Sequence, residues 1–307
     1  MTIKPKNWVV TGGAGFVGSC VVRHLLKQKQ HVTVLDNFSS SNSNSLKDIR
    51  SQIRLVQGSI LDEKKLRLAF KEADYVLHLA AEASVAQSFQ NPAATMQNNV
   101  EGTAHVLQQA HLAGVKKVLF ISSSSVYGMG GKTARVETSR LDPLSPYAMS
   151  KLLGEDLCQF YTKTYGLNVV IARCFNIYGS TQPSDSAYAA VLTKWATLAK
   201  KGLPLQINGD GLQTRDFLHV RDTVRALLTI TKKGKAGEVY NVGSGQSATL
   251  LKTVKLLEKA AGKPLKISFH PSREGDVRFS RANIGKLKSL GFSPKISLEN
   301  GLKEFFS

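Results

Sequence analysis

Residues 9–19 read VVTGGAGFVGS, and this stretch decides the fold. Among its glycines, Gly12, Gly15 and Gly18 are spaced three apart, between an apolar run and a helix-like apolar period. Gly12 would permit a tight turn, Gly15 a close approach of backbone to a pyrophosphate, and Gly18 close packing of helix on strand. The helix N-terminus would offer free N–H groups and its dipole to the phosphates. The stretch therefore predicts the first β-α unit of a dinucleotide-binding domain.

The second predicted strand, HVTVLD at 31–36, ends in Asp36. A carboxylate in this place can accept hydrogen bonds from the adenosine ribose and would repel a 2′-phosphate, so NAD is favoured over NADP. The structural alternative is a glycine turn beside a helix-capping aspartate. Because the glycines and the aspartate occur together in this order, the sequence favours nucleotide binding.

Short apolar runs alternate with helical periods along the first half of the chain. Strands are predicted at 8–13, 31–36, 53–58, 75–80, 117–122 and 168–174, with helices near 16–26, 62–72, 98–113 and 147–165. Repeated β-α-β units predict an α/β fold, a Rossmann-type doubly wound parallel sheet. Beyond Arg173 the rhythm changes to a helix near 188–200, a strand at 239–245, a helix at 249–261, a strand near 265–269 and a final helix.

This change predicts two domains. We expect an NAD-binding Rossmann domain over 1–175, completed by about 214–243, and a smaller C-terminal α/β substrate-binding domain over 176–213 and 244–307.

Composition limits the class of protein. The chain has 307 residues, of which 42% are hydrophobic and 21% charged, as in soluble enzymes. No apolar stretch approaches the roughly 18 uncharged residues of a membrane span, and no secretory signal precedes the first strand. The three cysteines form no CxxC pair, which indicates neither a disulfide framework nor a zinc site. We therefore expect a cytoplasmic enzyme with no membrane partner and no metal.

The net charge of +19 comes from 41 Lys+Arg against 22 Asp+Glu. Such a field would attract an anionic substrate, and nucleic-acid binding is the alternative. The basic residues are dispersed and form no long block, so we do not expect a nucleic-acid partner.

Two polar stretches carry the candidate chemistry. Tyr147 and Lys151, in PYAMSK, lie four apart and share one helix face. A tyrosine titrates near pH 10, but a neighbouring ammonium and a nicotinamide cation would favour its phenolate. The serine run in ISSSSVYGMGG (121–131) follows a strand whose carboxyl end should face the ligand crevice. An ordinary exposed Tyr/Lys pair and a linker are the alternatives.

The chain resembles the extended short-chain dehydrogenase/reductases of the NAD-dependent sugar-nucleotide epimerase/dehydratase family. The resemblance covers nearly the whole chain. It rests on TGGAGFVGS, HLAAEASV, NNVEGT, SSSSVYG, SPYAMSK, ARCFNIYG, GDGLQTRDFLHVRD, VYNVGSG and REGDVRFS, in family order. The resemblance implies a catalytic triad of Ser123, Tyr147 and Lys151.

The resemblance also implies binding positions. Those for NAD are Gly12, Gly15, Phe16, Val17, Gly18, Asp36, Asn37, Ser59, Ile60, Leu79, Ala80, Ala81, Asn99, Tyr147 and Lys151. Those for a UDP-sugar are Ser84, Ser123, Ser124, Tyr147, Asn176, Ala190, Val191, Arg215, Arg273, Asp276 and Ser280. Ser59 stands where the family usually has an aspartate that contacts adenine. Many relatives form homodimers through the helix of the Tyr/Lys pair, where Leu152, Leu153, Leu157, Phe160 and Tyr161 could form an interface or intramolecular core.

The serine run also discriminates among reactions. Dehydratases of this family carry an Asp-Glu pair after the active hydroxyl, and decarboxylases a glutamate before VYG, whereas this chain has Ser124 and Ser125. Neither serine is a carboxylate acid or base, so the resemblance implies a 4-epimerase. Ser280 stands where epimerases of plain hexoses have a tyrosine. This position and AYAAVLTKW (187–195) resemble UDP-N-acetylglucosamine 4-epimerases, with UDP-glucose/galactose or uronic forms as further substrates.

The sequence leaves other functions open. They are a dehydratase, reductase or decarboxylase of the same family, and a non-catalytic nucleotide- or nucleic-acid-binding relative. His78 could be proposed as a general base, but at the end of a central strand we interpret it as a structural core histidine.

Overall fold

The computed structural model describes residues 5–41, 43–183, 191–272 and 277–307. Ala190, Arg273 and Asp276, three of the expected substrate positions, lie outside these ranges. The chain divides into two compact units. The first unit comprises the described parts of Met1–Ser123, Ser145–Arg173 and Leu227–Val239, and the second those of Ser124–Leu144, Cys174–Ala226 and Tyr240–Ser307.

A parallel seven-stranded sheet organises the fold, in the order β11-β6-β5-β4-β1-β2-β3. Its strands are β1 Asn7–Thr11, β2 His31–Asp36, β3 Arg54–Gln57, β4 Tyr75–His78, β5 Lys117–Ser123, β6 Val169–Cys174 and β11 Val239–Val242. Val10 of β1 stands between Val34 of β2 and Leu77 of β4 in the parallel register. The winding reverses between β1 and β4, and ligands bind at such a switch point in open α/β sheets. The predicted doubly wound Rossmann-type sheet is confirmed.

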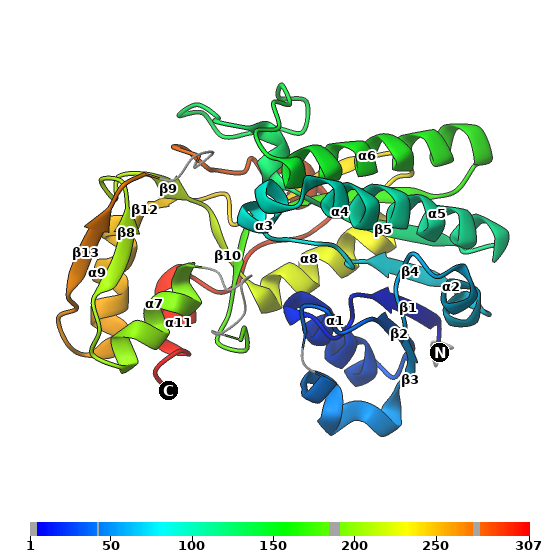
Figure 1. Ribbon diagram of the computed structural model, residues 1–307, viewed down its shortest axis with the longest axis horizontal. Coiled ribbons are helices and arrows are strands. Elements are labelled where there is room, and N and C mark those ends of the chain that lie inside the picture. The colour runs from blue at the N-terminus through cyan, green and yellow to red at the C-terminus, as the bar shows by residue number, and fades with distance from the viewer. Residues whose placement is uncertain (1–4, 42, 184–190, 273–276) are drawn as a thin grey trace. The chain divides into compact units, whose positions relative to one another are not determined.

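Helices cover both faces of this sheet (Figure 1). Helix α1 (Phe16–Lys27) lies on one face, and α2 (Glu63–Phe70), α5 (Gly102–Leu112) and α6 (Pro146–Tyr165) lie on the other. Short elements join them, namely η1 (Ser43–Gln52), α3 (Val85–Gln90), α4 (Pro92–Met96), the π-helical turn η2 (Gln97–Glu101) and η3 (Ser124–Tyr127). The helix expected at 98–113 thus begins as a π-helical turn.

Local sequence explains where α6 begins and how closely it packs. Ser145 caps the helix, because its hydroxyl accepts the Ala148 N–H at 3.1 Å, and Pro146 occupies the first turn. A Cβ at Gly154 would lie 2.5 Å from Cζ of Phe120. Only glycine therefore lets α6 approach β5 this closely, which sets the position of Tyr147 and Lys151 near the strand end.

The second unit is built from shorter pieces. Its strands are β7 Asn176–Tyr178, β8 Leu205–Asn208, β9 Thr214–Arg215, β10 Phe217–His219, β12 Ala248–Thr249 and β13 Ile267–His270, which form three two-stranded sheets. Its helices are α7 Val191–Lys200, the start of α8 Val220–Lys233, α9 Leu250–Ala261, α10 Gly285–Ser289 and α11 Leu298–Lys303. The sequence did not predict α8, and the expected final helix is two short ones.

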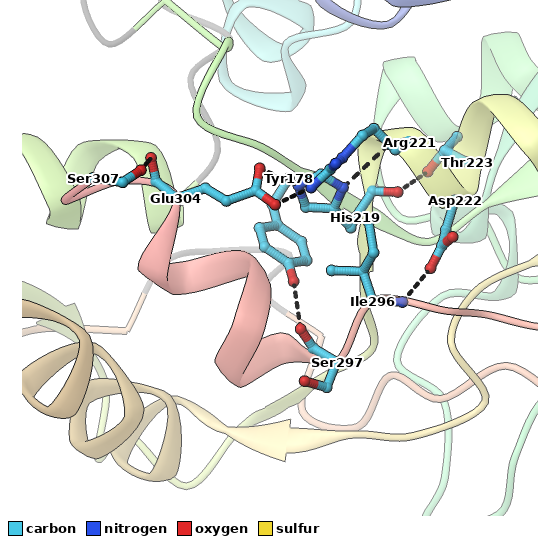
Figure 2. A network of polar contacts seen from close by, with 9 residues as sticks. All are labelled: Tyr178, His219, Arg221, Asp222, Thr223, Ile296, Ser297, Glu304 and Ser307. Carbon is cyan, nitrogen blue, oxygen red and sulfur yellow. Dashed lines mark hydrogen bonds and ion pairs between the residues drawn. The ribbon is translucent and has the colours of Figure 1, made fainter.

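Polar side chains fasten the C-terminal segment of this unit (Figure 2). His219 Nε2 lies 3.2 Å from a carboxylate oxygen of Glu304, and Arg221 also pairs with Glu304. Asp222 Oδ2 accepts the N–H groups of Lys295 and Ile296 at 2.7 and 2.8 Å. The chain end is therefore tied back to β10 and the start of α8.

The division into units differs from the predicted domains chiefly in two segments, residues 124–144 and 214–226, and at the boundaries, residues 174–175 and 240–243. All of these belong to the second unit, whereas we expected them in the first domain. The reason for 124–144 is its hydrogen bonding, since Glu137 accepts the Asn241 N–H at 2.8 Å and the Arg135 N–H binds Arg281 O at 2.8 Å. The assignment of cofactor and substrate to separate domains stays a prediction.

Candidate active site

The glycine loop joins β1 to α1 in the first unit. Gly12 has a φ of +68°, and a Cβ there would lie 2.7 Å from the backbone N of Ala80. A Cβ at Gly18 would collide with the carbonyl oxygen of Gly12. Both positions therefore require glycine, as the sequence predicted, and the loop passes tightly beneath the end of β4. Phe16 and Val17 begin α1, and its N-cap residue is Gly15, which has no side chain that could accept the first-turn N–H groups. This helix N-terminus therefore suits a pyrophosphate.

Asp36 ends β2 and is buried. Its Oδ2 accepts the Ala14 N–H at 2.8 Å, and its Oδ1 accepts the Phe38 N–H at 2.8 Å and the Ser41 hydroxyl at 3.2 Å. Three groups among the described residues donate to this carboxylate, and since a carboxylate has about four acceptor positions, it can also accept a ribose hydroxyl. These contacts fix the carboxylate beside the glycine loop, and the residues present fit NAD.

Other expected cofactor positions line the ends of β3 and β4. The N–H groups of Leu79 and Ala80 donate to the backbone and side-chain oxygens of Thr11 at 3.1 and 3.3 Å, and Ala81 follows. Ser59 accepts the Leu61 N–H at 3.1 Å, and the neighbouring Ile60 is buried. Asn37 is exposed and bonds Ser39. The Ser59 hydroxyl therefore stabilises the turn in which Ser59 itself lies.

Asn99 lies in the π-helical turn and is buried. Its Oδ1 accepts the Glu82 N–H at 2.8 Å, and its Nδ2 donates to Glu82 O and Ser150 Oγ, both at 2.9 Å. Ser150 in turn donates to the carbonyl of Tyr147 at 2.8 Å. The amide thus joins the segment after β4 to the first turns of α6.

The expected triad belongs to two neighbouring elements of the first unit. Ser123 is the last residue of β5, and Tyr147 and Lys151 lie one turn apart on α6. Lys151 is buried, its Nζ donates to the carbonyl of Ile121 at 2.9 Å, and the same atom lies 6.0 Å from the Tyr147 ring centroid. The ammonium is thereby held between the tyrosine and the strand end that carries Ser123.

Sequence reasoning missed a buried ion pair one turn further along α6. Glu155 and Arg173 are both buried, and Arg173 donates through Nη2 at 2.6 Å and Nε at 2.9 Å to the two carboxylate oxygens. Ser122 donates to the same carboxylate at 2.5 Å. The available signals were an arginine inside the apolar strand VVIARC and a glutamate four residues after Lys151. The pair fixes α6 against the residue that precedes Ser123.

The second unit gathers its own group of expected substrate residues. Asn176 Nδ2 donates to Asp216 O at 3.2 Å, and Arg215 Nη1 donates to Thr214 O and Val277 O at 2.8 and 2.5 Å. The Ser280 N–H donates to the Thr214 hydroxyl at 3.3 Å. The structure therefore brings Arg215 and Ser280 together on adjacent segments, with Asn176 on the neighbouring strand.

The remaining expected substrate residues lie elsewhere. Val191 begins α7 and packs against the core of the second unit. Ser84 caps α3 by accepting the Gln87 N–H at 3.1 Å, and Ser124 begins η3. The structure gives Val191 and Ser84 local structural contacts, and their substrate roles stay predictions.

A buried carboxylate orders the segments around Arg215. Asp216 is fully buried and accepts the N–H groups of Ser244, Gly245 and Ala282 at 2.7, 3.1 and 3.0 Å, and the Ser244 hydroxyl at 2.6 Å. Burial raises the pKa of Asp216, while these hydrogen bonds oppose that rise. One side chain thus joins the link between β9 and β10 to two separate loops.

The described residues contain neither a membrane-spanning helix nor a cluster of metal ligands. Within them, no helix is both long and apolar enough to cross a bilayer. Nor do three or more His, Cys, Asp or Glu side chains gather there as ligands for a metal ion.

Comparison with known proteins agrees with this geometry. Residues 8–243 match the sequence family described as the NAD dependent epimerase/dehydratase family. The chain belongs to this family. It is similar to the UDP-glucose 4-epimerase of Thermotoga maritima, solved with UDP-glucose, with a TM-score of 0.93 and 37% identity over 97% of both chains.

Two further family structures show the range of reactions. The UDP-N-acetylglucosamine 4-epimerase of Methanobrevibacter ruminantium, in complex with UDP-N-acetylmuramic acid, has a TM-score of 0.93 and 33% identity over 99% of this chain and 97% of that chain. The dTDP-glucose 4,6-dehydratase DesIV of Streptomyces venezuelae, solved with NAD bound, has a TM-score of 0.91 and 32% identity over 97% and 95%. This family member therefore uses NAD, and its relatives act on nucleotide sugars.

Proposed function

We propose that this family member is an NAD-dependent UDP-sugar 4-epimerase that interconverts UDP-N-acetylglucosamine and UDP-N-acetylgalactosamine. The observation that carries the proposal is the neutral serine run at the carboxyl end of β5, where Ser123 ends the strand and Ser124 and Ser125 follow. Elimination of water and loss of carbon dioxide need further acid and base groups, which serines do not supply. Epimerisation needs only the triad and the NAD that carries the hydride.

Each residue of the triad has a task in this reaction. Tyr147, as the phenolate, takes the proton of the sugar 4-hydroxyl, with the Ser123 hydroxyl hydrogen-bonded to both groups. The Lys151 ammonium, held by the carbonyl of Ile121 at 2.9 Å, stabilises the phenolate. NAD, when bound, supplies reversible hydride transfer at carbon 4. The 4-keto sugar turns about its diphosphate link and is reduced on its other face, while Tyr147 returns the proton.

The second unit supports the choice of substrate. Arg215 is a planar donor suited to diphosphate oxygens, and Ser280 lies on the adjacent segment. A serine at 280 leaves room for an acetamido group, and a wider pocket also admits the smaller UDP-glucose and UDP-galactose. Similarity to the UDP-N-acetylglucosamine 4-epimerase of Methanobrevibacter ruminantium also supports this choice.

A homodimer is part of the proposal. Of the expected interface residues on α6, Leu157 and Tyr161 pack against the core of the first unit, whereas Leu153 and Phe160 are exposed. Met149 and Tyr165 add exposed apolar surface on the same helix, as does Leu112 at the end of α5. A second copy would bury this surface. Light scattering should give twice the chain mass, and Leu153→Arg with Phe160→Glu should give the monomer.

One assay tests the reaction. The purified protein is incubated with UDP-N-acetylglucosamine, UDP-glucose or UDP-glucuronate without added cofactor, and the epimers are separated by chromatography. We expect the N-acetylgalactosamine epimer, and Tyr147→Phe should abolish its formation while NAD stays bound. A dehydrated or decarboxylated product would establish one of the other reactions, and oxidation of added NAD(P)H would establish a reductase.

A further inference from the structure

A buried hydrogen-bonded chain crosses the first unit behind the glycine loop. Thr11, His78 and Thr103 come from β1, β4 and α5, and all three are buried. His78 Nδ1 lies 2.7 Å from the Thr11 hydroxyl, and His78 Nε2 lies 3.0 Å from the Thr103 hydroxyl. This arrangement confirms that His78 is a core residue, although its partners are hydroxyl groups.

The direction of every hydrogen bond in this chain follows from the acceptors at its end. Thr103 lies 2.5 Å from the carbonyl of Asn99, which can only accept, so the single hydroxyl hydrogen points there. The Thr103 oxygen must then accept a hydrogen from Nε2 of His78. In a neutral ring Nδ1 is the acceptor, so Thr11 donates to it, and the Thr11 oxygen accepts the Ala80 N–H at 3.3 Å. Each hydrogen has one position, and His78 has one tautomer.

The surroundings keep the ring neutral. Burial, and to a smaller extent the Lys151 ammonium, lower the pKa of His78 to about 3. The other groups described around the ring are the two threonine hydroxyls and the Phe120 ring, whose centroid lies 5.7 Å away. None of these is a carboxylate that could stabilise an imidazolium.

The two ends of the chain lie at functional positions. Thr11 immediately precedes Gly12, and its partner Ala80 supplies the backbone against which Gly12 packs. At the other end, Asn99 carries the amide that bonds Ser150, which donates to the carbonyl of Tyr147. The imidazole therefore stands between the cofactor loop and the turn that contacts the catalytic helix.

We propose that His78 is a positioning residue, whose Nε2–H tautomer holds the glycine loop and the Asn99 turn at a fixed separation so that NAD is retained and Tyr147 stays aligned. The alignment of Tyr147 rests on the proposed function, whereas the retention of NAD rests only on the family's cofactor. His78 acts through Thr11 and Thr103 and touches neither the sugar nor the transferred hydrogen.

A matched pair of variants tests this role. Thr103→Val keeps the shape of the side chain but removes the acceptor of the Nε2–H, whereas Thr103→Ser keeps the hydroxyl. We expect Thr103→Val to weaken NAD binding about tenfold, as the loss of one buried hydrogen-bond partner allows, and to lower kcat more than it changes KM for the UDP-sugar. Thr103→Ser should stay within about twofold of the wild type.

The tautomer is measured directly on the wild-type protein. Nitrogen-15 histidine NMR should show His78 as the Nε2–H form from pH 5.5 to 8.5, with the resonances assigned by their loss in His78→Gln. An Nδ1–H form, or titration within that range, would overturn the proposal even where a variant fails to fold.

The outcomes separate this proposal from the proposed function. If Thr103→Val loses thermal stability but binds NAD and turns over like the wild type, His78 only packs the core and the proposal is wrong. If no UDP-sugar is epimerised, yet Thr103→Val weakens NAD binding and Thr103→Ser restores it, the proposed function fails while the role of His78 in retaining NAD stands.

Discussion

The two units bury polar groups in different ways. In the first unit the polar groups inside the sheet and helix layers partner one another, as Glu155 does with Arg173 and His78 with two threonines. Asp36, at the end of a strand beside the glycine loop, accepts backbone N–H groups instead. In the second unit the buried carboxylates of Asp216 and Asp222 accept backbone N–H groups from loops. A long parallel sheet satisfies its own backbone, whereas two-stranded sheets leave neighbouring loops to be held by side chains. Where strands are short, carboxylates therefore replace sheet hydrogen bonds.

The largest effect is expected from Glu155→Ala in the first unit. The change leaves the buried Arg173 guanidinium without its counter-charge, which should lower the free energy of unfolding by about 3–5 kcal/mol. Urea unfolding followed by circular dichroism measures this. Lys64→Ala, an exposed position on α2 of the same unit, is the control and should change stability by less than about 0.5 kcal/mol. Equal losses of stability in the two variants would show that the buried ion pair does not stabilise the first unit.

Asp216→Ala should have the next largest effect, in the second unit. It leaves the N–H groups of Ser244, Gly245 and Ala282 without this acceptor, at an expected loss of about 2–4 kcal/mol. The loss is smaller than for Glu155 because no buried charge remains. Asp210→Ala, which removes an exposed partner of Arg278, is the control and should leave the free energy of unfolding within the error of the measurement. A neutral Asp216→Ala would show that the loops hold without the carboxylate.

The loss of stability in acid that is due to His78 should be intermediate in size. Its pKa is about 3 in the folded chain and 6.5 when unfolded, so below pH 6.5 the unfolded state binds more protons. Stability contributed by the neutral ring is present above pH 6.5 and is lost as the pH falls, by about 2 kcal/mol at pH 5. His78→Gln should remove this part of the pH dependence. Parallel wild-type and variant curves of unfolding free energy between pH 5 and 7 would contradict the expectation.

Glu304→Gln should have the smallest effect. Burial lowers the pKa of His219, and the Glu304 carboxylate opposes that lowering. Glu304 is about one-third exposed, so its removal should cost less than about 1 kcal/mol at pH 7. Without the carboxylate the pKa of His219 falls further, and the loss of stability below pH 6.5 should become steeper. The measurement is the pH series used for His78, and a shallower acid limb would count against the pairing.

The sequence predicted the parts of the site that lie in continuous motifs. The glycine loop and Asp36 follow from spacing, and the shared face of Tyr147 and Lys151 follows from helical period. The resemblance added Ser123 and the family. These residues could be found because each signal lies within a few neighbouring positions.

Other features could not be predicted because their partners are distant in the chain. Asp216 bonds segments near 244 and 282, and Arg173 meets Glu155 across a helix and a strand. Helix α8, by contrast, could have been predicted, because Val220, Val224 and Leu227 recur at helical spacing and form a buried apolar face.

The π-helical turn at Gln97–Glu101 has a consequence for how this region could change. Such a turn holds one residue more than an α-helical turn, and one residue rotates a helix by about 100°. The segments before and after it, Pro92–Met96 and Gly102–Leu112, are therefore out of phase. Deleting a single residue would restore a continuous helix, yet would swing the Asn99 amide away from Glu82 and Ser150. The turn therefore accommodates one inserted residue, and its irregular backbone points the Asn99 amide toward Glu82 and Ser150.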